Sequence, residues 1–182
     1  ETEYSTVPFE AKMITQHVKN GALNARQNNI NEISDYNEHC NSIKQGAQDF
    51  IQQVKANKLL SNIEKNNLIK ARQNIKDCDK KNSFITVDAN SSLAAQQFSS
   101  YLNGIISFYN ANFSTATKIF TALKNSNQPW IQETSYYMLV RSSLNEAYQS
   151  GVGEYGDLDL QKLNSNLLTG FFNNTTQYLK KY

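Results

Sequence analysis

Hydrophobic residues recur at alternating steps of three and four along residues 33–54. The positions are Ile33, Tyr36, Cys40, Ile43, Ala47, Phe50 and Val54. Such steps keep side chains on one face of a helix, as in the seam of a coiled coil. The pattern therefore predicts a long amphipathic helix over this segment.

A second helix is predicted to return along the first. A polar interruption at 57–58 is followed by Ser61 and Glu64, which form the S-x-x-E pattern of a helix-capping box. Four further apolar positions supply the facing seam: Leu68, Ala71, Ile75 and Cys78. Residues 30–80 are therefore predicted to form a long antiparallel helical hairpin.

The rest of the chain predicts further helices joined by short polar turns. One short helix is expected at 11–26, before the hairpin. Beyond the polar break at 79–92, where Asn90, Ser91 or Ser92 can act as a cap, a helix runs to the turn at 110–112. Its partner covers 113–125. Pro129, which suits the first turn of a helix, begins another that extends to about residue 149.

The last helix is expected after a glycine-rich loop at 151–157, with Asp157 or Asp159 as its cap. Its apolar positions are Leu160, Leu163, Leu167, Phe171, Tyr178 and Leu179. Only 7 Gly and 2 Pro punctuate the chain, which favours long helices over the many turns of a β-sandwich. We expect an all-α fold of antiparallel helical hairpins. Residues 1–82 and 83–182 are its two regions, in one continuous globular unit that is a fragment of a longer protein.

The two cysteines lie on facing seams at equal distances from the turn of the hairpin. Antiparallel helices of equal rise place Cys40 and Cys78 at about the same height, where a disulfide can join them. Two free cysteines acting as small apolar core residues are the alternative. A disulfide would indicate an oxidising compartment.

Charge patterning argues against nucleic acid as a partner. The 18 basic and 16 acidic residues are scattered along the chain, and the longest basic runs are pairs. A nucleic-acid groove needs a concentrated basic face, because neutralising phosphates supplies most of the affinity. No apolar run approaches the roughly 18 residues of a membrane span. We expect neither a nucleic-acid partner nor a span within this sequence.

A family resemblance lies in residues 101–148. Gly104, Phe108, Phe113, Ala116, Phe120 and Pro129 follow a spacing that resembles a tetratricopeptide repeat. Residues 171–182 look like the second helix of another such unit, and residues 129–141 are similar to helices in bacterial cell-envelope proteins of this class. The resemblance implies that Gly104 and Ala116 let two helices approach closely. It also implies a non-catalytic scaffold that holds a peptide or a partner protein.

Candidate binding residues are polar or aromatic positions on the first helix of each unit: Asn103, Tyr109, Tyr136 and Arg141. Arg141 is the strongest of them, because a planar guanidinium can clamp a carboxylate or a backbone carbonyl. A structural role is the alternative for each. The tyrosines would then be half-buried packing residues, and Arg141 would pack on Tyr137 with its head paired to Glu133 or Asn145.

Catalytic and metal-binding patterns are absent from the sequence. His17 and His39 are the two histidines, without the spacing of a metalloprotease, and neighbouring helix residues such as His39 and Cys40 point in different directions. His39 is therefore expected to be a surface residue. The acidic loop at 154–159 lacks the full pattern of a calcium loop. We expect no catalytic residue, metal or cofactor.

Two functional classes stay open at this point. The first is a protein- or peptide-binding scaffold of an exported bacterial cell-envelope protein, secreted or periplasmic. The second is a helical-bundle enzyme or small-ligand carrier with an aromatic pocket. A deep, closed pocket with inward carboxylates would favour the second class, and a shallow groove the first.

Overall fold

The computed structural model describes residues 38–40, 42–76, 78, 81–153 and 157–182. This part of the chain is all-helical, as the sequence predicts. It contains the short 3₁₀ helix η2 (Glu38–Cys40) and six α-helices: α2 (Ile43–Ala56), α3 (Asn62–Gln73), α4 (Leu93–Tyr109), α5 (Phe113–Leu123), α6 (Pro129–Gly151) and α7 (Ser165–Lys181). The helix expected at 11–26 and the seam positions Ile33 and Tyr36 lie outside the described residues.

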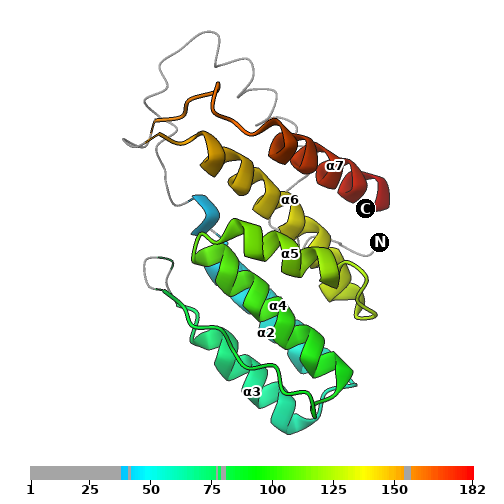
Figure 1. Cartoon of the computed structure of the whole chain (residues 1–182). Coiled ribbons are helices and arrows are strands. Elements are labelled where there is room, and N and C mark those ends of the chain that lie inside the picture. Colours follow the sequence, from blue (N-terminus) through cyan, green and yellow to red (C-terminus); the bar gives the residue numbers. More distant parts are fainter. Residues whose placement is uncertain (1–37, 41, 77, 79–80, 154–156) are drawn as a thin grey trace.

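Consecutive helices form side-by-side pairs. Figure 1 shows α7, α6, α5 and α4 following one another across the molecule, with α2 behind α4 and α3 at the far side. None of these described helices is both long and apolar enough to cross a membrane.

The predicted N-terminal hairpin is present but shorter than expected. A continuous helix over 33–54 is wrong, because η2 ends at Cys40 and a separate helix begins at Ile43 after Ser42. Helix α3 ends at Gln73, so Ile75 and Cys78 follow it as non-helical residues. Ile75 is nevertheless buried in the core. Apolar residues at helical spacing therefore indicate which side chains are buried, and buried residues can follow one another beyond the end of the helix.

The predicted capping box joins two hairpins. The Glu64 carboxylate accepts hydrogen bonds from the backbone N–H of Ser61 (2.7 Å) and from that of Ser92 (2.8 Å), the cap residue of α4. These backbone bonds, that of Ser61 first, hold the pKa of Glu64 at about 2, below the ordinary 4.5. One side chain therefore fixes the starts of both α3 and α4.

We expect Glu64→Gln to weaken the dependence of stability on acid pH. A carboxyl with a depressed folded-state pKa stabilises the fold above its unfolded pKa of about 4.5, and this contribution is lost as pH falls towards 2. The exposed site limits the effect at pH 7 to about 1 kcal/mol. Urea unfolding of wild type, Glu64→Gln and the control Glu133→Gln between pH 2 and 7 measures it. A difference between wild type and Glu64→Gln that stays constant over this range would contradict the assignment.

An extended segment connects α3 to α4 and runs back along α4. Its backbone is held by amide side chains spaced seven residues apart on that helix. Gln96 donates to the Ala89 and Ser91 carbonyls, Asn103 exchanges two 2.9 Å bonds with Ile85, and Asn110 does the same with Asn82 at 2.9 and 2.7 Å. Positions seven apart lie on one face of a helix. These amides therefore bind both backbone groups of Asn82 and of Ile85, and so hold the segment against α4.

The core is aromatic and centres on α4. Phe50, Phe98, Phe108 and Phe120 are fully buried, and Phe50, Phe98, Tyr101 and Trp130 form a cluster of rings with centroids 5.2–6.2 Å apart. Gly104 faces α5 so closely that a Cβ on it would stand 2.7 Å from the ring of Phe120. Gly104 and Ala116 are both buried between α4 and α5, as the close-approach prediction requires.

The last helix begins later than the sequence suggests. Asn164 caps α7 by accepting from the backbone N–H of Asn166 and Leu167, so the prediction of Asp157 or Asp159 as the cap is wrong. Asp159 instead accepts from the Gln161 N–H and pairs with Lys162 at 3.4 Å. Leu160 and Leu163 precede the helix. Asp and Asn are both good N-cap residues, so Asp157, Asp159 and Asn164 are all candidates and the residue type alone does not select one of them.

Candidate functional site

A small cavity lies where α2, α3, α4 and α6 meet. Its volume is about 40 Å³, and its walls combine two arginines, an aspartate and several aromatic residues. The lining residues are Ser42, Gly46, Asp49, Arg72, Tyr101, Ile105, Tyr109, Trp130, Thr134, Tyr137, Met138 and Arg141. Several of the lining residues from α2 and α6 are half-buried, so the cavity approaches the surface between these two helices.

Arg72 forms the inner wall. Its side chain is 2 % exposed, because Leu68, Arg72 and Ile75 share the buried face of α3 and the turn that follows. The guanidinium donates to the carbonyls of Ile75 (3.1 Å) and Ile43 (2.7 Å), which ties α3 to the first turn of α2. Burial lowers the pKa of Arg72, but an arginine pKa is high enough that the group stays charged at neutral pH.

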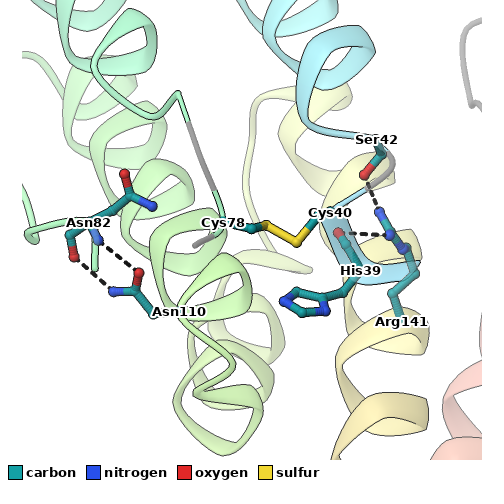
Figure 2. Close-up of a disulfide and its surroundings, with 7 residues drawn as sticks. All are labelled: His39, Cys40, Ser42, Cys78, Asn82, Asn110 and Arg141. Atoms are coloured by element: carbon teal, nitrogen blue, oxygen red, sulfur yellow. Dashed lines mark hydrogen bonds between the residues drawn. A yellow bond between two sulfur atoms is a disulfide. The ribbon is translucent and has the colours of Figure 1, made fainter. Parts of the chain in front are cut away.

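Arg141 forms the outer wall. Its guanidinium donates to the Ser42 hydroxyl and to the His39 carbonyl (3.3 Å), as Figure 2 shows. Its Cζ lies 4.8 Å from the ring centroid of Phe108 and 5.8 Å from that of Tyr137. The expected packing on Tyr137 is therefore present.

The Arg141 guanidinium does not bond to Glu133 or Asn145, the partners expected for a structural role. Asn145 bonds to the backbone carbonyl of Arg141 rather than to its guanidinium. The guanidinium reaches the segment before α2 instead of Glu133. Arg141 thus connects α6 to a segment about a hundred residues earlier in the chain, which a pattern within one helix could not indicate.

The electrostatic balance of the cavity is positive. Helix α2 starts there with no acidic residue in its first turn and no side-chain bond from its cap Ser42, so its positive end is uncompensated locally. Among the described residues, no carboxylate oxygen lies within 4.0 Å of either guanidinium. Asp49 is the acid in the lining, and its carboxylate accepts from Gln45 at 2.9 Å. Burial raises the pKa of Asp49.

Tyrosine hydroxyls complete the polar wall. Tyr101, Tyr109 and Tyr137 are all buried, and burial raises the pKa of Tyr101 and of Tyr137. Both therefore stay neutral hydroxyls that can donate hydrogen bonds. The Tyr109 hydroxyl and the Arg72 Nη2 each lie 3.9 Å from the place where a Cβ on Gly46 would stand. These two donors thus converge beside the backbone of α2.

The structure brings two of the four predicted binding residues together. Tyr109 and Arg141 both line the cavity. Asn103 does not, and its amide binds the backbone of Ile85. Tyr136 lies towards α7, where its ring meets Tyr182 and the Lys181 ammonium.

Sequence reasoning missed Arg72, Asp49 and Thr134. For Arg72 a signal existed, because it is four residues after Leu68 and three before Ile75, on the apolar face of the helix.

The predicted disulfide between Cys40 and Cys78 is confirmed, with the two Cα atoms 5.9 Å apart. It joins η2 to the chain beyond α3 and lies beside His39 (Figure 2). His39 is not the expected surface residue. It is half-buried, with its ring edge-on to Phe108 and Phe113 at 5.7 and 5.5 Å, and burial lowers its pKa.

A histidine and two sulfurs lie together here. Possible ligand atoms of His39, Cys40 and Cys78 fall within 4.8 Å of one another. Metals bind cysteine as thiolate, and in the disulfide these two sulfurs are bonded to each other. In this state the cluster therefore offers no thiolate for a metal.

Comparison of the chain with known protein families, with curated proteins and with solved structures finds no match. Functional inference therefore rests on the geometry of the cavity.

Proposed function

We propose that the chain is a non-catalytic binding module that holds part of a partner protein or peptide at the cavity between α2 and α6. The observation that carries this proposal is a pair of arginines in one cavity, one of them 2 % exposed, without a described carboxylate within ion-pair distance. A buried charge without a counter-charge is costly to maintain, so such an arrangement favours a group supplied from outside.

The volume of the cavity distinguishes this function from the alternative of an enzyme or small-ligand carrier. Pockets for cofactors and metabolites usually enclose 300–1,000 Å³. The cavity has about 40 Å³, which admits one functional group and not a whole cofactor. A partner that inserts one side chain or terminus, and lays the rest across α2 and α6, fits these dimensions.

The proposal extends to architecture and location. The successive pairs α4–α5 and α6–α7 support a tetratricopeptide-like scaffold, in which helix pairs present a binding face. The disulfide supports an oxidising compartment. We therefore propose a periplasmic or secreted location, and a bacterial cell envelope remains part of the proposal.

Site-specific photocross-linking tests the position of the binding face. Thr134, half-buried on the cavity rim, is compared with Thr176, exposed on α7, because each hydroxyl bonds the carbonyl four residues earlier. We expect a photoreactive phenylalanine at 134, and not at 176, to cross-link one partner in cells that produce the protein. Equal cross-linking at both positions would contradict the proposed face.

Arg141→Gln tests the role of the charge in the same assay. We expect the cross-link from position 134 to fall at least tenfold while the melting temperature stays close to that of wild type, since Arg141 is half-buried at the edge of the cavity and a glutamine keeps a polar side chain there. Lys124→Gln removes a charge near Tyr136, away from the cavity, and is the matched control. A lower melting temperature with the cross-link retained would show that Arg141 is only structural.

A further inference from the structure

We infer that the cavity is a site for a single carboxylate group, held between the guanidinium groups of Arg72 and Arg141. This inference rests on the proposed function and names the chemistry that the partner inserts. The carboxylate comes from a peptide or from a free small acid, and the experiment below distinguishes these sources.

Charge selects a monoanion. Arg72 and Arg141 contribute two positive charges, and the first turn of α2 adds the partial positive charge of a helix N-terminus. Asp49, the acid in the same lining, contributes at most one negative charge. The difference, 2 − 1, leaves one unit of positive charge, which one carboxylate neutralises and a dianion would exceed.

Size selects a planar group. A water-sized sphere needs about 10–15 Å³ of such volume, so 40 Å³ holds about three groups of that size. A carboxylate has three non-hydrogen atoms, whereas sulfate and phosphate have five in a tetrahedron. The cavity therefore fits the planar end of a carboxylic acid better than a tetrahedral oxyanion.

The donors already present match carboxylate oxygens. Arg72 uses two of its five N–H groups on backbone carbonyls, and Arg141 donates to a hydroxyl and a carbonyl. All four acceptors are neutral. A carboxylate is the better acceptor, because it carries a full negative charge and its two oxygens can accept a pair of N–H groups from the planar guanidinium at once. The Tyr109 hydroxyl, which like Arg72 Nη2 lies 3.9 Å from the Cβ position of Gly46, can donate a further bond.

Nuclear magnetic resonance titration of the full chain tests the ligand class. Sodium acetate, formate, sulfate and chloride are added separately at constant ionic strength, and the backbone amide signals of residues such as Gly46 and Thr134 are followed. We expect saturable shifts with acetate and formate, and none with sulfate or chloride. Arg141→Gln should weaken acetate binding at least tenfold, and Lys124→Gln should leave it unchanged. Equal responses to all four anions, or an unchanged response in Arg141→Gln, would overturn the inference.

Short capped peptides identify the source of the group. An acetylated Ala-Asp-Ala amide is compared with its Asn counterpart, and an acetylated trialanine acid with its amide. Tighter binding of either acid than of both acetate and its own uncharged counterpart supports a peptide source. Binding of acetate and formate with no gain from either peptide indicates a free small acid.

Two outcomes separate the carboxylate site from the proposed function. If no carboxylate binds while cross-linking at 134 still depends on Arg141, the ligand class is wrong and the binding module stands. If carboxylates bind and no partner cross-links, the site stands and the protein-binding function is wrong.

Discussion

Replacing both Cys40 and Cys78 by serine is expected to lower the free energy of unfolding by about 3–4 kcal/mol. The bond closes a loop with a sequence separation of 38 residues, and its loss frees the unfolded chain to occupy many more conformations. Urea unfolding of the double variant and of wild type, without reductant, measures the difference. A matched experiment reduces the wild-type protein with a dithiol, which should produce a similar loss.

The same change should also loosen the outer wall of the cavity. Arg141 takes its acceptors from His39 and Ser42, the residues on either side of the segment that Cys40 anchors. Peptide mapping of the never-reduced protein should recover one peptide that links Cys40 to Cys78. Two thiols that alkylate freely in that protein would contradict both the bond and its role in stability.

Gly104→Ala is expected to destabilise the fold by about 1–3 kcal/mol, although alanine is the better helix former. The new Cβ would stand 2.7 Å from the ring of Phe120, a fully buried side chain that cannot turn away without disturbing the core. Ala116→Leu should overpack the same contact to a similar extent. Thermal unfolding of the purified variants measures both effects.

Gly170→Ala is the matched control for Gly104→Ala. Gly170 also lies inside a helix, but nothing stands within 4 Å of the Cβ that alanine would add. We expect this variant to gain about 0.5–1 kcal/mol from helix propensity. If Gly104→Ala stabilises the protein as Gly170→Ala does, the close approach of α4 and α5 is wrong.

Local signals in the sequence predicted much of the fold. Ser61 with Glu64, Ser92 and Pro129 each mark a helix start that the structure confirms, because a cap depends on residues within one turn. The sequence does not predict the break between Cys40 and Ile43. Cys40 has helical spacing to Ile43, Phe50 and Val54, although it belongs to η2 and these three residues belong to α2. Apolar spacing shows which residues become buried, and caps show where helices begin.

The cavity was only partly predictable. Arg141 and Tyr109 could be selected one at a time, from residue type and position on a helix. Their meeting with Arg72 and Asp49 depends on how α2 and α3 pack against α4 and α6, and this packing involves contacts far apart in sequence. Asn103 is predicted as a binding residue because it is polar and lies on the first helix of a pair, but the segment after α3 binds its amide. Sequence pattern could not foresee that the chain itself would occupy this position.

The most direct measurement observes the two guanidinium groups themselves. Arginine Nε–H signals of Arg72 and Arg141 can be assigned with the variant Arg141→Lys and followed while sodium formate is added at constant ionic strength. Our interpretation predicts that both signals shift together and saturate at the same formate concentration, because one carboxylate lies between the two side chains. Signals that stay unchanged, or that move independently with different midpoints, would contradict a shared carboxylate site.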